Sequence, residues 1–264
     1  MDEKKRQEIV FAVATTELLS PVNFLLQGFD SDPDKCRALT RAINNSKEFV
    51  NWQRWRLEEN PLYQQPIPYV MVCKDGKLLC YRRRECGDFR LLGKASVGIG
   101  GHVNTDEDKD DIMKATRREL NEELMFNGKT LSEKDVVERI YPAGILKDWR
   151  DPVGAVHVGV VMAFDATGLE IEAREEGIHI GWIDNTDEYM DSTHGLPNLE
   201  GWSEMILKKY NKLKHEERPW TKLKKVSSLT PPSSSETSQE STSSRKAKIS
   251  SPLPVSRKRP RSRS

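Results

Sequence analysis

Three glutamates are spaced so that their side chains would gather on one face of a helix. Glu119, Glu122 and Glu123 occupy positions i, i+3 and i+4, while Leu120 and Leu124 would point the other way. Like charges this close repel one another, and a divalent cation among the carboxylate oxygens relieves the repulsion. Oxygen ligands suit Mg²⁺ or Mn²⁺, and the chain has few His and Cys residues to offer zinc. The segment therefore predicts a site for Mg²⁺ or Mn²⁺.

A pair of glycines, Gly100 and Gly101, precedes this segment. A residue without Cβ lets the backbone turn sharply and lets a carbonyl or N–H group approach a metal or a phosphate closely. Loop and helix together predict a cradle for phosphate and metal. A cation held there would polarise a phosphoryl oxygen and activate water, which is what hydrolysis of a phosphoanhydride requires.

The pattern resembles the Nudix box, the signature of the MutT-like hydrolases. The resemblance is carried by Gly101, by Glu107, and by the run Arg118-Glu119-Leu120-Asn121-Glu122-Glu123. More of the chain is similar to a bacterial branch described as predicted phosphoesterases, in five segments: Leu26-Gln27-Gly28-Phe29, Gln65-Pro66-Ile67-Pro68-Tyr69, Gly98-Ile99-Gly100-Gly101-His102, Pro152-Val153-Gly154-Ala155-Val156-His157-Val158-Gly159 and Glu200-Gly201-Trp202-Ser203. This similarity covers roughly residues 10 to 210.

The resemblance implies roles for individual residues of the box. Glu122 and Glu123 would be the main metal ligands, and a backbone carbonyl of Gly100 would be a further one. Glu119 would be either a metal ligand or the base that deprotonates water, and Arg118 would orient the carboxylates. Because family members place the general base differently, both roles of Glu119 stay open.

Two features depart from the family pattern. Ten residues separate Glu107 from Arg118, where the family has seven. Either the loop holds an insertion, or Asp110, which is separated from Arg118 by seven residues, takes the place of Glu107. The glycine usual after the paired glutamates is Met125 here, so a helix stop is expected slightly later, at Asn127-Gly128.

Some side chains outside the box are weaker candidates. Arg90 is expected to bind substrate phosphates, because it lies close to the glycine loop in sequence. A later acid often completes the site in the family, and Glu175 or Glu176 would fill that position. His102 and His157 are expected to make structural hydrogen bonds.

The elements that must position these residues follow from hydrophobic periodicity and turn signals. Asp75-Gly76 lies between two apolar runs and predicts a hairpin over residues 68–81. The other expected elements are strands over residues 9–14, 95–99, 136–145 and 155–164 and helices over residues 110–124 and 198–210. With the resemblance, this order predicts the α/β class: a Nudix fold, an α/β/α sandwich with a mixed β-sheet, plus a disordered C-terminal tail.

Charge and composition differ between the tail and the rest of the chain. Residues 226–264 are rich in Ser, Thr and Pro and hold eight Lys and Arg against two Glu, a local charge of +6, so the other residues carry −5. Nucleic acid is therefore an unlikely partner except through the basic tail. No apolar run is long enough to span a membrane, and a cytoplasmic protein with reduced cysteines is expected.

We expect residues 1–60 to form an N-terminal extension packed on a Nudix hydrolase domain of residues 61–215, followed by the disordered tail of residues 226–264. The expected activity is metal-dependent hydrolysis of a phosphoanhydride bond in a nucleoside diphosphate linked to another moiety, with water as the nucleophile. Its partner would be a small-molecule nucleotide, and a homodimer is one option. The alternatives are a non-catalytic Nudix-fold nucleotide-binding or regulatory module, which has no need of clustered metal carboxylates, and an RNA-associated protein that uses the basic tail.

Overall fold

The computed structural model of the chain describes residues 3–22, 27–83, 93–150, 152–174, 178–183 and 199–210. Arg90, Glu175, Glu176 and the tail of residues 226–264 lie outside the described residues, so the predictions made for them stay predictions. No helix in the described ranges is long and apolar enough to cross a membrane.

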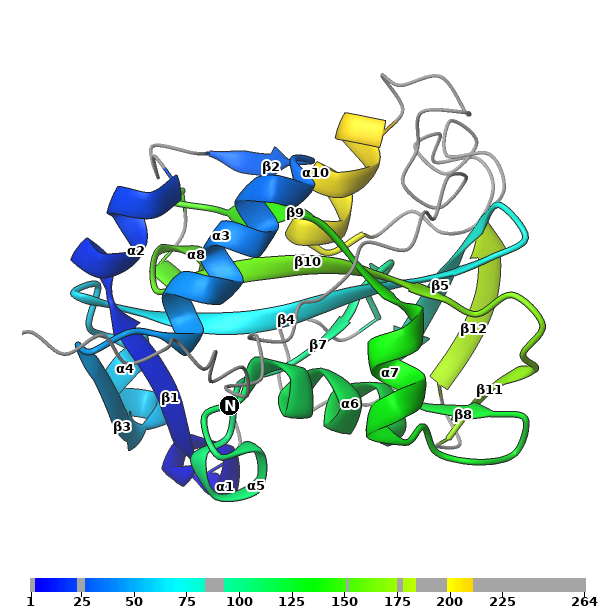
Figure 1. Cartoon of the computed structure of the whole chain (residues 1–264), viewed down its shortest axis with the longest axis horizontal. Coiled ribbons are helices and arrows are strands. Elements are labelled where there is room, and N and C mark those ends of the chain that lie inside the picture. The colour runs from blue at the N-terminus through cyan, green and yellow to red at the C-terminus, as the bar shows by residue number, and fades with distance from the viewer. Residues whose placement is uncertain are drawn as a thin grey trace, which may run out of the picture. The chain divides into compact units, whose positions relative to one another are not determined.

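Most of the described strands belong to one mixed sheet, whose main path runs β12-β5-β4-β10-β9-β2. Their bounds are β2 (Gly28–Asp30), β4 (Tyr63–Lys74), β5 (Lys77–Arg83), β9 (Ile140–Lys147), β10 (His157–Asp165) and β12 (Ile178–Ile183). The central pair, β10 and β4, is parallel from His157↔Gln65 to Asp165↔Cys73, and the other neighbours on the path are antiparallel. The predicted mixed sheet is confirmed (Figure 1).

Strands from the first sixty residues join this same sheet. The predicted strand at residues 9–14 is β1 (Ile9–Ala14), which pairs antiparallel with β3 (Phe49–Gln53). At its end β1 also pairs with the beginning of β4, and β2 lies beside β9. The sheet that carries the site is therefore built partly from the N-terminal segment.

The predicted hairpin at Asp75-Gly76 is present between β4 and β5. Both residues have positive φ, 50° and 78°, as a tight type I′ turn requires. The strand predicted over residues 95–99 is instead split into β6 (Ala95–Ser96), which pairs with β5, and β7 (Ile99–Gly100), which pairs with β4. The break falls where Gly98 passes the ring of Tyr69, so closely that a Cβ would lie 1.9 Å from a ring carbon.

Helices cover both faces of the sheet. Their bounds are α1 (Glu3–Gln7), α2 (Thr15–Val22), α3 (Pro33–Asn44), α4 (Arg54–Glu58), α5 (Thr105–Asp108), α6 (Ile112–Glu123), α7 (Glu133–Arg139), α8 (Pro152–Ala155) and α10 (Gly201–Tyr210). Successive residues of β10 alternate between two cores: Val160 packs in the core with α3, α6 and α7, and Val161 packs in the core with α10. Figure 1 shows α6 and α10 on opposite sides of β4 and β10, so the predicted α/β/α sandwich is confirmed.

Two predicted boundaries are wrong. Residues 133–139 form α7 rather than the start of a strand, because Ser132 and Asp135 make a reciprocal capping box at its N-terminus. Helix α6 ends at Glu123, and the chain continues as β8 (Leu124–Phe126), which pairs with β11 (Ile171–Ala173). Asn127-Gly128, predicted to stop the helix, is the turn that follows β8, with φ of 51° and 68°.

A buried lysine fixes the beginning of β10. The Lys147 ammonium group donates to the carbonyls of Gly154, Ala155 and His157 at 2.6, 2.8 and 2.9 Å, and to Gln64 Oε1 at 2.6 Å. Burial of a charge is tolerable only when it is hydrogen-bonded in this way. These contacts join α8, β9 and β4 and hold the backbone of His157 in place.

Candidate functional site

Helix α6 carries the glutamates of the site and begins at a side-chain cap. Asp111 accepts hydrogen bonds from the N–H groups of Met113 and Lys114 at 2.8 and 3.2 Å, which satisfies two of the free donors of the first turn. Its apolar side, including Ile112 and Leu120, is buried in the core. The opposite side is left for charged residues, as the sequence predicted.

Arg118 is the centre of the charged network. Its guanidinium donates to both oxygens of Asp108 at 3.0 and 2.8 Å, and to Glu119 Oε1 at 2.7 Å. It also donates to Glu122 Oε1 at 3.3 Å and to the backbone carbonyl of His102 at 2.8 Å. One side chain thus ties α5, α6 and the glycine loop together, as expected of a residue that orients the carboxylates.

Neither Glu107 nor Asp110 is the main acidic partner of Arg118. The main acidic partner is Asp108, which is 2% exposed and also accepts a hydrogen bond from the Asn104 N–H at 2.8 Å. Glu107 is exposed and lies 3.4 Å from Arg118 Nε, and Asp110 accepts instead from Asn51 at 3.0 Å.

No sequence pattern singles out Asp108, because it lies in a run of acidic residues whose burial cannot be predicted from residue type. Its position follows from helix α5, which is capped by the Asn104 side chain. After α5, Lys109 and Asp110 both take positive φ, 54° and 60°, and turn the chain into α6. The extra residues of the loop therefore form a short helix and a turn.

Glu119 is packed directly against the glycine loop. A Cβ on Gly101 would lie 2.0 Å from Glu119 Oε1, so only glycine leaves room for the carboxylate. Burial raises the pKa of Glu119 to about 7 against the opposing charge of Arg118, and the charges of Glu122 and Glu123 raise it further. A carboxyl group with this pKa can accept or release a proton near neutral pH.

The donor set of α6 fits a hard divalent cation. Arg118 Nη1 lies 2.7 Å from a Glu119 oxygen and 3.3 Å from a Glu122 oxygen, so a single cationic atom can reach both carboxylates. The structure does not bring all three predicted ligands together: among the described residues, Glu119, Glu122 and Glu123 are not a group whose ligand atoms all lie within 4.8 Å of one another. Gly100, the neighbour of Gly101 in the glycine loop, is held so close to Pro68 that a Cβ would lie 2.2 Å from the Pro68 carbonyl oxygen.

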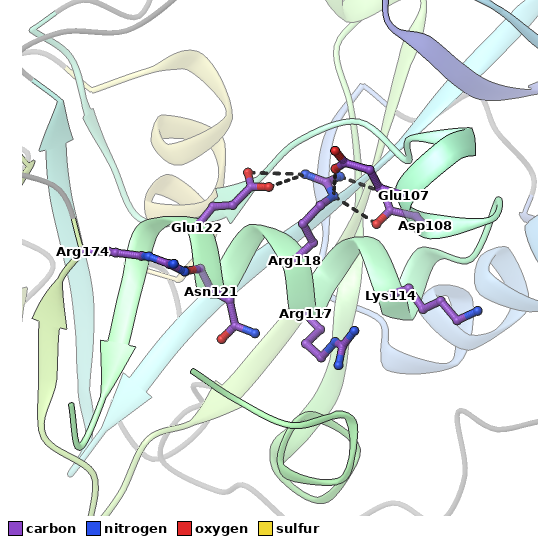
Figure 2. Close-up of a pocket in the computed structure, with 8 residues that line it drawn as sticks. All are labelled: Glu107, Asp108, Lys114, Arg117, Arg118, Asn121, Glu122 and Arg174. Atoms are coloured by element: carbon purple, nitrogen blue, oxygen red, sulfur yellow. Dashed lines mark hydrogen bonds and ion pairs between the residues drawn. The ribbon is translucent and has the colours of Figure 1, made fainter. Parts of the chain in front are cut away.

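A pocket of about 380 Å³ opens along the charged side of α6. Figure 2 shows Arg118 between Glu122 on one side and Glu107 with Asp108 on the other. The residues that line the pocket are Glu107, Asp108, Lys114, Arg117, Arg118, Asn121, Glu122 and Arg174. Carboxylates and basic side chains thus share one opening, which matches a substrate that carries phosphates and is bound with a metal.

Arg174 is a lining residue that sequence reasoning missed. It follows β11, its N–H donates to the Glu123 carbonyl at 2.9 Å, and its guanidinium donates to the carbonyl of Asn121. These two bonds hold it at the end of α6. Only the pairing of β11 with β8 brings it there, and that pairing has no local sequence signal.

A second group of polar side chains lies on the other side of the glycine loop. His102 Nε2 and His157 Nε2 are 2.9 Å apart, and His157 Nδ1 is 2.6 Å from the carbonyl oxygen of Val153. Hydrogen bonding by both histidines was expected, but their meeting was not. Glu58, from α4, joins them, and the three side chains offer ligand atoms that all lie within 4.8 Å of one another.

Comparison with known proteins identifies the fold. No protein-family model matches the chain. Protein YmaB of Bacillus subtilis (strain 168) is 29% identical over 210 residues, which span 77% of this chain and 97% of that protein. The crystal structure of Tm1382, described as "a putative Nudix hydrolase", superposes with a TM-score of 0.57 at 20% identity, covering 77% of this chain and 98% of that one. The chain therefore has the fold of a Nudix hydrolase.

A more distant match is a bifunctional NMN adenylyltransferase/ADP ribose pyrophosphatase from Francisella tularensis, complexed with AMP and a manganese ion. It is 16% identical, covers 56% of this chain and 41% of that chain, and has a TM-score of 0.39. A TM-score this low supports no inference about the chemistry of this chain. The match to Tm1382, by contrast, extends over nearly all of that protein.

Proposed function

We propose that the chain is a Nudix hydrolase that cleaves a phosphoanhydride bond in a nucleoside diphosphate linked to another moiety. The metal would be Mg²⁺ or Mn²⁺, and water would be the nucleophile. The observation that carries the proposal is the Arg118 network, which joins Glu119 and Glu122 of the predicted metal site to the glycine loop. The Nudix fold and the Arg-Glu-Leu-x-Glu-Glu pattern support it from two other directions.

The metal would be held by carboxylates of Glu119, Glu122 and Glu123, together with the backbone carbonyl of Gly100. When bound, such a cation neutralises phosphate charge and makes water a better nucleophile. Arg118 keeps Glu119 and Glu122 in place between α5 and the loop, which lowers the cost of bringing them together. The substrate would bind in the pocket beside them.

Glu119 has the properties of the group that takes the proton from water. It is buried against Gly101, and its pKa is raised to about 7, so it is partly ionised at neutral pH. Glu122 is exposed in the pocket and has more freedom to meet a ligand. Glu119 would therefore be the base that takes the proton from water or, as the alternative, a metal ligand, and Glu122 would bind the metal.

Lys114, Arg117 and Arg174 are the basic side chains that would receive the phosphates. All three line the pocket, and in Figure 2 Lys114 and Arg117 project from α6 on the side away from Glu122. Phosphate oxygens pair well with guanidinium and ammonium groups. Arg90 was the predicted phosphate ligand, and it remains a further candidate for the same role.

The test is a hydrolysis assay with Mg²⁺ or Mn²⁺ on a panel of nucleotides: nucleotide sugars, dinucleoside polyphosphates, ADP-ribose, NADH, oxidised nucleotides and capped RNA. We expect metal-dependent turnover of at least one compound by the wild type. Glu122→Gln should lower kcat/KM by about 100-fold or more, because it removes a charged ligand of the cation. Glu138→Gln is the matched control, since Glu138 lies on α7, is not among the residues that line the pocket, and forms a 3.9 Å ion pair with Lys134.

Two results would contradict the proposal. If no compound of the panel is hydrolysed but one binds tightly, the chain is a nucleotide-binding module rather than an enzyme. If Glu122→Gln keeps full activity, the site assignment is wrong even though the activity is right. Deletion of residues 226–264 tests the alternative of an RNA-associated protein. If the deletion abolishes RNA binding but leaves hydrolysis of small nucleotides intact, the tail alone contacts RNA.

A further inference from the structure

Three side chains from distant parts of the sequence converge beside the glycine loop. Glu58 comes from α4, His102 follows Gly101, and His157 begins β10. One carboxylate oxygen and one nitrogen of each imidazole lie within 4.8 Å of one another. Among the residues that the structure describes, no other group of three or more His, Cys, Asp or Glu side chains has its ligand atoms close enough together to hold one metal ion.

The two imidazoles lie close to the separation of ligands that share a metal. Zinc binds histidine nitrogen at about 2.0–2.1 Å, so two such ligands at the tetrahedral angle are about 3.3–3.4 Å apart. His102 Nε2 and His157 Nε2 are 2.9 Å apart, so a bound ion requires the two nitrogens to separate by about 0.4–0.5 Å. Their rings are nearly perpendicular, with an interplanar angle of 77°. A carboxylate oxygen of Glu58 lies within 4.8 Å of both imidazole ligand atoms, and its side chain is 15% exposed.

The surroundings resemble those of metal ligands in other proteins. A histidine that binds metal almost always donates its second ring N–H to a carbonyl or a carboxylate. His157 Nδ1 lies 2.6 Å from the Val153 carbonyl oxygen, which accepts that proton, so His157 Nε2 is the acceptor in the hydrogen bond with His102 Nε2, whose place a metal ion would take. Glu58 is held in turn by Arg54, whose Nε lies 3.2 Å from Glu58 Oε1.

We propose that Glu58, His102 and His157 form a transition-metal site of the zinc type, separate from the carboxylate site on α6. Two imidazole nitrogens and one carboxylate oxygen suit Zn²⁺ and related ions, whereas Mg²⁺ prefers oxygen ligands alone. The site joins α4, the glycine loop and β10, so a bound metal cross-links the N-terminal segment to the loop that carries Gly100 and Gly101. The sequence analysis disfavoured zinc because His and Cys are few, and no local motif joins these ligands, which are 44 and 55 residues apart along the chain.

The test uses the full chain freed of metal by a chelator. Zn²⁺ is titrated against a chromophoric competitor in the presence of millimolar Mg²⁺, which occupies oxygen-only sites. We expect one equivalent of Zn²⁺ to bind and to raise the melting temperature. Glu58→Gln and His157→Gln should each weaken binding by about tenfold or more, and the larger loss is expected for His157, because each change removes one ligand. X-ray absorption at the zinc edge should show imidazole nitrogen in the first shell of the bound ion.

The control is the double variant Glu122→Gln/Glu123→Gln, which removes two of the carboxylates proposed to bind Mg²⁺ but leaves the histidine site intact. Its zinc affinity should equal that of the wild type, so the zinc result does not depend on the proposed hydrolase function. Glu58→Gln keeps the test valid if His157→Gln fails to fold. Absence of zinc binding, unchanged affinity in Glu58→Gln, or an edge spectrum without imidazole would overturn the proposal, and the two histidines would then be a hydrogen-bonded pair only.

Discussion

Replacement of Gly101 by alanine tests how closely the glycine loop controls Glu119. The added Cβ would lie 2.0 Å from Glu119 Oε1 and 2.4 Å from its Cδ, whereas ordinary contact begins at 3.4 Å. The carboxylate must therefore move by about 1.4 Å, the difference between the two distances. Such a movement breaks the 2.7 Å hydrogen bond from Arg118 Nη1.

The cost should appear mainly in activity. A displacement of about 1 Å at a reacting group lowers rate by about 100-fold, which corresponds to about 2.7 kcal/mol of lost transition-state stabilisation. Overpacking of this kind costs about 1–3 kcal/mol of folding free energy, so the variant should still fold. The measurements are kcat/KM on the substrate found with the nucleotide panel, Mn²⁺ affinity by electron paramagnetic resonance, and urea denaturation.

Gly181→Ala is the matched control, because a Cβ at that position in β12 meets no atom within 4 Å. It should leave kcat/KM and Mn²⁺ affinity unchanged. Wild-type activity and Mn²⁺ affinity in Gly101→Ala would refute the reasoning, because Glu119 would then work from a position different from the one in the structure.

Two further predictions concern the same network. Asp108→Asn removes the charge that faces Arg118, so the free energy of unfolding measured with urea should fall by on the order of 3 kcal/mol. Asp106 is exposed, and Asp106→Asn should change the free energy of unfolding little. Equal effects of the two changes would show that the ion pair between Asp108 and Arg118 does not stabilise the fold. Glu119 has a pKa raised from 4.5 to about 7, so between these values the folded protein keeps a proton that the unfolded chain has released. The free energy of unfolding, measured without divalent metal, should therefore fall by at most about 3 kcal/mol as pH rises from 4.5 to 7. If the Glu119→Gln variant shows the same dependence of unfolding free energy on pH, the dependence arises from other groups.

The sequence was a good guide where the signal is local. The hairpin at Asp75-Gly76 and the helix predicted over residues 110–124 rest on turn residues and on a regular apolar period; the hairpin is present, and the helix is present over Ile112–Glu123. The strand predicted over residues 136–145 is wrong for residues 136–139, because Val136 and Val137 favour strands while the capping box at Ser132 and Asp135 stabilises a helix. That capping pattern is itself a local signal in the sequence.

The site was predictable only in part, because its remaining contacts depend on tertiary structure. Glu119 and Arg118 could be chosen from their spacing, but the buried partner Asp108 could not be distinguished from its acidic neighbours. His102 and His157 meet because β10 lies beside β4 in the sheet, a contact that no periodicity along the chain reveals.

The parallel pairing of β4 with β10 also has a consequence for the rate at which the native state forms. His157 lies opposite Gln65, and about ninety residues must be ordered or looped out before this ladder can close. Contacts of such long sequence separation slow folding, because the entropy of loop closure is lost before the contact is gained. The central ladder should therefore form late, after local elements such as the β4–β5 hairpin. Until then the apolar edge of β4 is open to pairing with another chain, which makes the period before β10 arrives the one most prone to aggregation.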